Sequence, residues 1–325
     1  MRDAEDTLPA CLASLRVQTL ADHEVVAVDD GSVDGTPTIL AAAAVVDPRV
    51  RVVRTRPRGL VAALNGALAA ARGTLLARMD SDDVAHPERL ALQAATLDAD
   101  SRCAILGCRV RLVSASPIAG GGMGPYVDWL NGLLTHADIV RDLLVESPLA
   151  HPSVMMRAEV LRGLGGYRDF DGPEDYDLWL RAYERGWRFG KRPEVLLDWR
   201  DRPARLTRRD PRYAPERFRA LKIQALERGR LRGGRGVVVW GAGPVGKGWA
   251  RALRARGHRV AAFVEVDPRK IGQRVHGSPV VDLSGAAAFP AELHLAAVGR
   301  PGARERIRGA ARALGLPADD LVAVA

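Results

Sequence analysis

The sequence predicts an α/β protein with two domains, each built around a sheet of parallel strands. Three observations support this prediction. Helices and strands alternate through the first 100 residues, a second alternating unit starts near residue 236, and a length of 325 residues suits about two domains. Strands that are separated by single helices form parallel sheets with helices on their faces.

The expected elements follow from the apolar pattern along the chain. In the first unit, helices are predicted at 6–18, 36–46 and 59–73, and strands at 23–30, 50–54 and 74–79. The stretch 116–135 is expected to be irregular because it contains the glycine-rich sequence AGGGMG. Further helices are predicted at 136–146, 157–164, 175–186 and 214–229, and a further strand at 194–199.

These elements divide the chain into a first domain at residues 1–209, a basic helical linker at 210–232 and a second domain at 233–325. The net charge of +9 lies in one short segment, because residues 200–235 contain 13 Lys and Arg residues against 4 Asp and Glu residues. Two interpretations are open. Basic residues gain about 1 kcal/mol each at an anionic lipid surface, so the segment could contact a membrane; alternatively, it is a solvated arginine-rich linker.

Composition excludes several classes of protein. No apolar run approaches the ~18 residues of a membrane span, and no signal peptide follows Met1. The three cysteines form no CxxC pair, which is typical of reduced thiols. We therefore expect a cytoplasmic protein, with peripheral contact at the inner membrane face as the open alternative and no nucleic-acid partner.

Acidic residues follow two predicted strands at the point where each strand ends. Asp29 and Asp30 close the strand in EVVAVDD, and Asp80, Asp82 and Asp83 follow the strand in ARMDSDD. Ligands of parallel sheets bind beyond the carboxyl ends of the strands, so both groups are expected to line a common crevice. Such carboxylates bind a divalent cation or accept hydrogen bonds from a ribose or a base. The structural alternative is a helix cap, since Asp82 or Asp83 precedes the helical stretch HPERLALQ.

Four motifs occur in order along the chain: EVVAVDDGSVDGT, ARMDSDD, HPSVMMR and GPEDYDLWLR. In this order and at this spacing they resemble the inverting glycosyltransferases of family two, and the resemblance covers roughly residues 1–209. It implies a GT-A fold and transfer of a sugar from a nucleoside-diphosphate donor to an acceptor hydroxyl. It also implies a divalent cation, Mn²⁺ or Mg²⁺, which neutralises charge on the departing diphosphate.

On the donor side, the resemblance assigns a role to each acidic residue. Asp29 and Asp30 match acids near the base of the nucleotide, and Asp80 matches the acid that faces the ribose. Asp82 matches the acid that holds the metal, and Asp83 is its neighbour.

On the acceptor side, Glu174 and Asp175 match the acidic pair that begins the acceptor-side helix, and Asp175 is expected to be the general base. An acceptor hydroxyl has a high pKa and needs a base within hydrogen-bond reach during attack. A carboxylate opposite the leaving group supplies that base and gives inversion in one displacement. The alternative is that both acids only favour a helix N-terminus by their charge.

Other polar and aromatic residues near these motifs have less specific interpretations. His151 is expected to be a hydrogen-bonded structural residue rather than a catalyst, and Trp179 is expected to lie in the core. Tyr126 and Trp129 are the better candidates for acceptor contact.

The chain departs from the family pattern at two places. In many relatives a histidine that can complete the metal shell follows the strand after the Glu-Asp helix; here WRDRPARLT places Arg202 there. A guanidinium stays protonated and cannot ligate a metal, but it can pair with a diphosphate. Relatives also begin with an apolar strand that this sequence lacks before Met1, so we expect a gapped sheet, an incomplete nucleotide pocket and a natural start upstream.

A glycine-rich turn begins the second alternating unit. In VVVWGAGPVG, Gly241, Gly243 and Gly246 follow a predicted strand and precede a helix, and Glu265 closes the next strand. Glycines in this pattern let the backbone approach a pyrophosphate at a helix N-terminus, and the acid can hold a ribose. We therefore expect a small Rossmann-like domain that binds a nucleotide or NAD(P), or one that has no ligand and docks a partner.

The favoured prediction is a glycosyltransferase that uses a nucleotide-sugar donor and a glycan or lipid-linked acceptor, in polysaccharide or glycolipid synthesis. Two alternatives stay open. One is a non-catalytic nucleotide-binding or assembly protein, and the other is a bifunctional enzyme that modifies a sugar with NAD(P).

Overall fold

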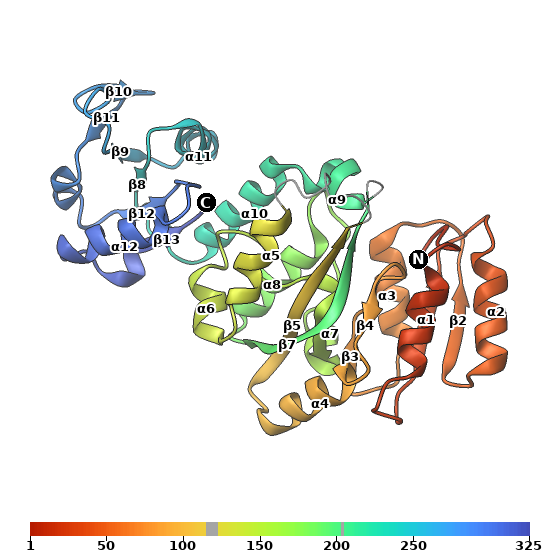
Figure 1. The fold of residues 1–325 in the computed structure, drawn as a ribbon. Helices are drawn as coiled ribbons and strands as arrows, with labels where there is room; N and C mark the ends of the chain where they lie inside the picture. Colours follow the sequence, from red (N-terminus) through yellow and green to blue (C-terminus); the bar gives the residue numbers. More distant parts are fainter. Residues whose placement is uncertain (115–122, 203–204) are drawn as a thin grey trace. The chain divides into compact units, whose positions relative to one another are not determined.

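The computed structural model describes residues 1–114, 123–202 and 205–325. It divides the chain into two compact units (Figure 1). Unit 1 contains Met1–Ile139 and Pro148–Tyr213, and unit 2 contains Val140–Ser147 and Ala214–Ala325. The predicted domain boundaries therefore need correction, because unit 2 starts before the predicted second domain and also takes a short segment from within the predicted first domain.

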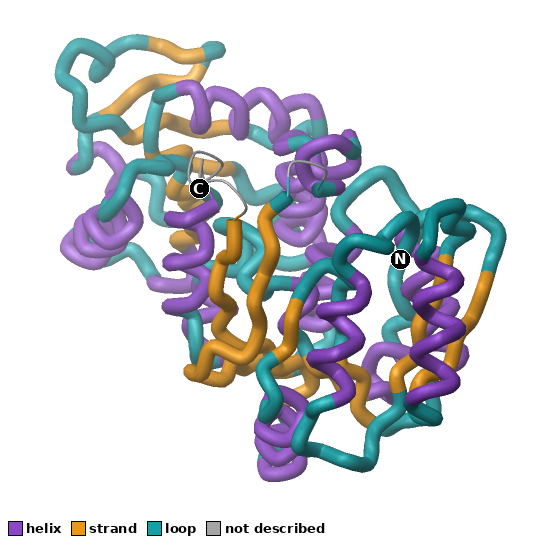
Figure 2. Tube along the Cα trace, turned by 45° about the vertical axis from the view of Figure 1, so that its right-hand side comes forward, coloured by secondary structure: helices purple, strands orange, loops and turns teal. Residues whose placement is uncertain are grey.

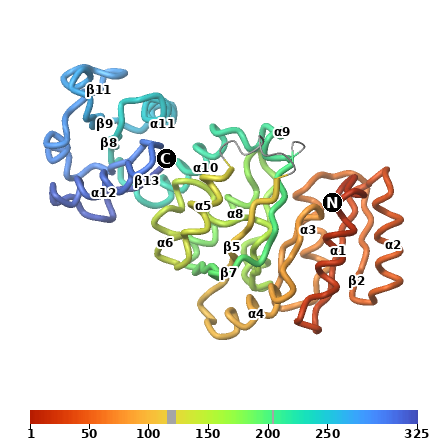
Figure 3. The backbone as a smooth tube through the Cα atoms, in the orientation of Figure 1, coloured from red at the N-terminus to blue at the C-terminus, as the bar shows by residue number. Residues whose placement is uncertain are grey.

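Unit 1 begins with a small layer of helices and two parallel strands, as the apolar pattern predicts. Figure 3 follows this part in red and orange from the N-terminus. Its elements are α1 (Leu8–Arg16), β1 (Val25–Asp29), α2 (Thr36–Val46), β2 (Val50–Arg54) and α3 (Leu60–Ala70). Strands β1 and β2 pair in parallel from Val25 opposite Val50 to Asp29 opposite Arg54. Buried Leu8, Ala27 and Leu40 hold α1, β1 and α2 together.

The rest of unit 1 is built on a second, five-stranded sheet, in which β5 and β7 run side by side (orange in Figure 2). Its order is β3 (Leu75–Ala77), β6 (Met155–Arg157), β5 (Cys103–Ser114), β7 (Arg188–Asp201) and β4 (Val84–Ala85). Strand β3 pairs antiparallel with β6, so the prediction that β3 continues a parallel sheet with β1 and β2 is wrong. Within the described residues, β1 pairs only with β2.

The helices of this part of unit 1 cover the second sheet and carry much of the site. They are α4 (Arg89–Ala99), α5 (Met123–Gly132), α6 (His136–Arg141), α7 (Ala158–Gly163), α8 (Glu174–Glu184) and α9 (Leu206–Arg209), with 3-10 turns at His151–Ser153 and Pro211–Tyr213. The prediction of an irregular 116–135 is wrong for α5, whose Val127 and Leu130 pack on β5 and β7. Residues 116–122 of that stretch lie outside the described residues.

Unit 2 has the Rossmann-like alternation that the glycine turn predicts. Its strands are β8 (Val237–Trp240), β9 (Val260–Val264), β10 (Arg274–Val275), β11 (Ser278–Val281), β12 (Leu293–Ala296) and β13 (Leu321–Ala323). The order β10-β11-β9-β8-β12-β13 is parallel except for β10. Helices α11 (Pro244–Ala255) and α12 (Ala303–Ala313) join these strands, with 3-10 turns at Ser284–Ala288 and Ala318–Asp320. The direction of winding changes between β8 and β12, where ligands of such sheets bind.

Helix α10 (Pro215–Arg228) belongs to unit 2 and is not a linker. Its Ile223 and Leu226 are buried in one cluster with Val237 and Trp249. The prediction of a linker at 210–232 is therefore wrong for this helix. Its arginines dominate the sequence, but its apolar residues form one face that packs in the core of unit 2. Lys222 is also buried here and donates to the Val145 carbonyl at 2.7 Å.

Two further observations concern the helices and the basic segment. Among the residues that the structure describes, no helix combines the length and apolar character needed to cross a bilayer. The basic segment 200–235 is divided between the two units, and Arg208 and Arg235 are paired with Asp201 and Asp320. Peripheral membrane contact through this segment stays a prediction.

Candidate active site

The acidic residues after β3 form the densest cluster of metal-ligand oxygens in the described chain. One carboxylate oxygen from each of Asp80, Asp82 and Asp83 lies within 4.8 Å of the other two. Asp83 is 1% exposed; its Oδ1 accepts a hydrogen bond from the Arg200 N–H at 2.8 Å. Its buried Oδ2 has no hydrogen-bond partner among the described residues. Because buried polar atoms are normally paired, this oxygen is open to a further hydrogen-bond donor or a cation.

The crowding of negative charge changes the acidity of this cluster. Burial, and then the charge of Asp80, raises the pKa of Asp83 to about 8 and also raises the pKa of Asp82. The helix-cap interpretation is wrong, because α4 begins only at Arg89 with Glu88 before it. Three close carboxylates with hard oxygen ligands fit a divalent cation.

Two arginines that the sequence analysis missed hold this loop. The Arg78 side chain is 9% exposed and forms an ion pair with Asp80. Arg89, at the start of α4, is 1% exposed; it donates to the Arg78 carbonyl at 2.7 Å and to Gln93 Oε1 at 3.1 Å. The available signal was weak, since Arg78 interrupts an apolar strand and Arg89 reads as an ordinary surface residue.

Asp29 and Asp30 are buried at the end of β1, where they organise neighbouring loops. Asp30 accepts hydrogen bonds from the N–H groups of Arg58 and Gly59, both at 2.8 Å, and Asp29 Oδ1 accepts from Ser32 N–H at 2.9 Å. Contact of these two residues with a nucleotide base therefore stays a prediction.

The two acidic groups lie in one region of unit 1. Burial lowers the pKa of the Met1 amino group, which donates to the Val28 carbonyl at 2.8 Å. The negative charges of Asp80, Asp30 and Asp29 act in the opposite direction and raise the pKa of that amino group, with Asp80 having the largest effect of the three. Both groups therefore act on the Met1 amino group, and their lining of one common crevice stays a prediction.

The second acidic pair starts α8. Glu174 is 2% exposed; its Oε2 accepts a hydrogen bond from the Tyr213 hydroxyl at 2.8 Å, and its Oε1 lies 3.8 Å from His151 Nδ1. Asp175 is half-buried and accepts from the Tyr176 N–H at 2.7 Å. Burial, and then the charge of Glu174, raises the pKa of Asp175 to about 7. A carboxylate with such a pKa suits a general base near neutral pH.

His151 and Trp179 have the structural roles that were predicted for them. His151 Nε2 lies 2.9 Å from the Tyr167 hydroxyl, and the imidazole meets the Trp179 ring edge-on at 5.9 Å. Burial lowers the pKa of His151 well below its usual value, so the ring is neutral. Trp179 is fully buried.

The aromatic candidates for acceptor contact lie on α5. The rings of Tyr126 and Trp129 stack at 5.8 Å, and Tyr126 lies 6.4 Å from the Trp199 ring of β7. Trp199 belongs to a buried core cluster, and the partly buried Tyr126 and Trp129 pack against it, so acceptor contact stays a prediction.

Arg202 follows the end of β7 and is half-buried. Its positive charge acts to lower the pKa of Asp82, against the larger effects that raise it, so the guanidinium lies near the acidic cluster. Neighbouring arginines have their own partners: Arg205 lies 4.1 Å above the Trp199 ring, and Arg208 bonds Asp201 at 2.7 Å. Pairing of Arg202 with a diphosphate stays a prediction.

In unit 2, the glycine turn is tightly packed at two of its three glycines. Gly241 has a φ of +106°, and a Cβ at Gly246 would lie 1.8 Å from the Gly241 carbonyl oxygen. A Cβ at Gly243 would meet nothing within 4 Å. Glu265 accepts hydrogen bonds from the Ala242 N–H and Lys270 Nζ, both at 3.1 Å. Glu265, at the end of β9, is thus hydrogen-bonded to the glycine turn that follows β8. Binding of a nucleotide or NAD(P) at this turn stays a prediction.

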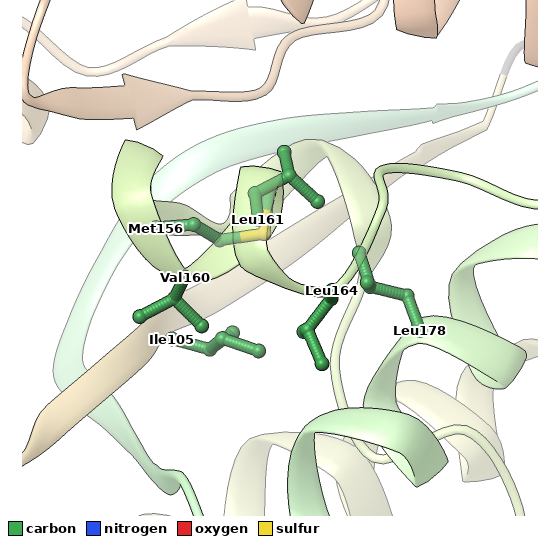
Figure 4. A pocket seen from close by; sticks show the side chains of 6 residues that line it. All are labelled: Ile105, Met156, Val160, Leu161, Leu164 and Leu178. Atoms are coloured by element: carbon green, nitrogen blue, oxygen red, sulfur yellow. The ribbon is translucent and has the colours of Figure 1, made fainter. Parts of the chain in front are cut away.

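An apolar pocket lies elsewhere in unit 1, among β5, β6, α7 and α8. Figure 4 shows the side chains that line it: Ile105, Met156, Val160, Leu161, Leu164 and Leu178. It has no polar side chain that could bind a sugar or a phosphate, so it is not a candidate site.

Comparison with known sequences shows clear similarity. The family described as Glycosyl transferase family 2 matches residues 1–164. EpsE of Bacillus subtilis, which is named as a glycosyltransferase, is 30% identical over 234 residues, which cover 70% of this chain and 80% of EpsE. AmsE of Erwinia amylovora, named as an amylovoran biosynthesis glycosyltransferase, is 31% identical over 198 residues, which cover 60% of this chain and 71% of AmsE.

Comparison with solved structures concerns the fold. Residues 1–349 of TarS from S. aureus, crystallised with UDP-GlcNAc, match with a TM-score of 0.57 at 20% identity. The match covers 71% of this chain but only 65% of the TarS chain. It supports the GT-A-like architecture of unit 1.

Proposed function

Because the chain belongs to glycosyl transferase family 2, we propose that it transfers a sugar from a nucleoside-diphosphate donor to an acceptor hydroxyl with inversion. One observation carries the proposal: unit 1 holds two separate carboxylate groups, one around Asp83 and one at Asp175, and both have raised pKa values. Perturbed acidity of this kind is typical of functional sites. The first group suits the donor and the second suits the acceptor.

On the donor side, Asp80, Asp82 and Asp83 would hold a divalent cation, with Mn²⁺ and Mg²⁺ as the candidates. When bound, the cation supplies charge neutralisation for the departing diphosphate. Arg202 would pair with the same diphosphate, and Asp29, Asp30 and Asp80 would face the nucleoside. The unpartnered Asp83 oxygen and the three converging carboxylates support this assignment.

On the acceptor side, Asp175 would take the proton from the attacking hydroxyl. Glu174 keeps negative charge beside Asp175 and so raises its basicity. Attack from the side opposite the diphosphate forms the new glycosidic bond as the old bond breaks, which inverts the configuration at the sugar carbon. The leaving group departs as the nucleoside diphosphate.

The names of the relatives suggest the biological setting. AmsE is named for biosynthesis of amylovoran, and by analogy the present chain would extend a polysaccharide or glycolipid, on a glycan or lipid-linked acceptor. The Rossmann-like unit would bind a nucleotide or NAD(P), or would have no ligand.

The test is turnover with a panel of UDP-, GDP- and TDP-sugars, with Mn²⁺ or Mg²⁺ and with chelator. We expect one donor to release its nucleoside diphosphate, with the product anomer inverted by NMR. Asp175→Asn should lower kcat about 10²–10⁴-fold, the usual range for a lost acid–base group, while calorimetry shows unchanged binding of the nucleoside diphosphate. Asp98→Asn, the same change at an exposed position of α4, is the matched control.

Three results would contradict parts of this proposal. A retained anomer would exclude single displacement. Lost donor affinity in Asp175→Asn would place this residue on the donor side. Nucleotide binding without turnover of any donor would instead support a non-catalytic binding protein.

A further inference from the structure

Polar side chains from three other segments of unit 1 lie near Glu174, and one of them is hydrogen-bonded to it. The Tyr213 hydroxyl, in the 3-10 turn at Pro211–Tyr213, donates to Glu174 Oε2 at 2.8 Å. His151 Nδ1 lies 3.8 Å from the other oxygen, Oε1, and His151 Nε2 lies 2.9 Å from the hydroxyl of Tyr167. Glu174, His151 and Tyr167 are all at least nine-tenths buried. The sequence motifs assign no role to Tyr213 or Tyr167.

The Tyr213 hydroxyl is the donor that reaches Glu174. It lies 2.8 Å from Oε2, whereas His151 Nδ1, at 3.8 Å from Oε1, is beyond hydrogen-bond distance. His151 instead makes its hydrogen bond with the Tyr167 hydroxyl through Nε2. A hydrogen bond from a hydroxyl group to a carboxylate stabilises the charged form of that carboxylate.

We propose that Tyr213 is a positioning residue for the proposed base Asp175, and that its hydroxyl holds Glu174 as an oriented carboxylate directly beside that base. The inference rests on the proposed function, since it needs Asp175 to act as the base. Tyr213 itself touches Glu174 and need not touch either substrate. Its effect passes through the negative charge of Glu174 to the adjacent residue.

The other groups that face Asp175 do not replace this effect. Glu174 on the same helix raises the pKa of Asp175, whereas the charge of Arg78, after β3, lowers it. Burial lowers the pKa of His151, so its ring is neutral. Burial, and then the charges of Glu174 and Asp175, raise the pKa of the Tyr213 hydroxyl well above its usual value. Tyr213 therefore stays protonated and remains a donor through the range in which Asp175 would titrate.

A change from Tyr213 to phenylalanine removes the donor and keeps the ring. Glu174 Oε2 would then be buried without its donor, so the Glu174–Asp175 pair would take up its first proton more easily. The upper apparent pKa of the pair should therefore rise. The sign follows from where the first proton goes: the donor stabilises both states in which Glu174 is ionised, so its loss favours only the state in which Glu174 itself is protonated.

The experiment compares the full chain with Tyr213→Phe, Glu174→Gln and the double variant. Tyr183→Phe is the matched control, because Tyr183 lies exposed on the same helix α8. Carboxyl titrations by NMR with ¹³C-labelled Asp and Glu need no substrate. The pH profiles of kcat and KM use whichever sugar nucleotide of the panel is turned over, and UDP binding is followed by calorimetry.

We expect Tyr213→Phe to raise the upper apparent pKa of the pair and to move the acid limb of kcat to higher pH. It should lower kcat about tenfold or more, with KM for the donor and UDP affinity unchanged. When Glu174→Gln is already present, Tyr213→Phe should change kcat little further, since the effects of two residues that act through one another do not add. Tyr183→Phe should match the parent protein throughout.

Either of two results would overturn the inference: an unchanged carboxyl titration in Tyr213→Phe, or full additivity with Glu174→Gln. A lowered melting temperature together with an unchanged titration would mean that Tyr213 only packs. Failure of the proposed function has a different signature. In that case Asp175→Asn keeps its turnover, whereas the carboxyl titration still reports whether Tyr213 acts on Glu174.

Discussion

Asp83 in unit 1 and Glu265 in unit 2 both lie in a segment that follows a strand of an α/β unit, after β3 and after β9, yet their surroundings differ. Asp83 has a buried oxygen without a described partner, and burial beside Asp80 raises its pKa. Glu265 is hydrogen-bonded by Ala242, Val266 and Lys270, and these bonds outweigh burial and lower its pKa. Among the described residues no group donates a hydrogen bond to Asp83 Oδ2, whereas Glu265 already has its donors within the fold. This difference separates a candidate ligand site from a structural contact, although the sequence patterns of the two look alike.

The largest expected effect tests the donor end of this comparison. Asp82→Asn should lower turnover about a hundredfold or more and remove most of the dependence on Mn²⁺ or Mg²⁺, because a metal contributes several kcal/mol to transition-state stabilisation. Initial rates over a cation titration measure it. Glu265→Gln is the matched control in unit 2 and should leave turnover unchanged.

Near-normal turnover in Asp82→Asn would remove the distinction between the two sites. It would mean that the carboxylates of Asp80, Asp82 and Asp83 have only a structural role and bind no metal that the reaction needs. A loss of turnover in both variants would instead show that the glycine turn of unit 2 takes part in the reaction.

An intermediate effect is expected at Arg202. Arg202→Ala should weaken binding of the nucleoside diphosphate about tenfold, the effect of about 1.4 kcal/mol, because a charge-assisted contact with the diphosphate is lost. Binding of the bare nucleoside should not change. Calorimetry with both ligands measures the difference, and exposed Arg209→Ala is the matched control. Equal effects on both ligands would show that Arg202 only packs or faces solvent.

The smallest expected effect is at Gly243 in unit 2. Gly243→Val should change the melting temperature little, because a Cβ at this position meets no atom within 4 Å and surface changes usually stay within about ±0.5 kcal/mol. If the turn binds a dinucleotide, the variant should lose the thermal shift that NAD(H) or NADP(H) gives the parent chain. The whole chain is needed, since α10 contributes to the core of unit 2. A parent chain without any thermal shift would identify the turn as structural.

Much of the fold could be predicted because its periodicity is local. The first helices and strands lie where the apolar pattern places them, and the glycine turn of β8 and α11 needs only a short stretch of sequence. The pairing of β3 with β6 could not be predicted, since their residues lie about 80 positions apart and β3 has only three residues. Helix α10 was misassigned because its charged residues outweigh the apolar positions that are buried.

The candidate site was predictable to a similar extent. Asp82 and Asp175 carry motifs, and their residue types indicate the chemistry directly. Arg89 and Tyr213 carry no motif, and each acts on a carboxylate or carbonyl that is distant in sequence or belongs to another element. Their contribution depends on burial and on which oxygens lack a donor, and neither property can be read from one sequence.

The short segment Val140–Ser147 makes unit 2 discontinuous, and this has a consequence for how the protein can be cut. The chain enters unit 2, returns to unit 1, and enters unit 2 again after Tyr213. Asp142 pairs with Arg308, and the Val145 carbonyl accepts from Lys222, so the segment is bonded to residues far later in the chain. A single protease cut near residue 213 would therefore leave part of unit 2 attached to the N-terminal fragment, and the two fragments should copurify. A gene truncated at that point would remove Arg308, one of the two arginines that pair with Asp142, and Lys222, which donates to the Val145 carbonyl. Removing the second unit therefore also requires redesign within the first.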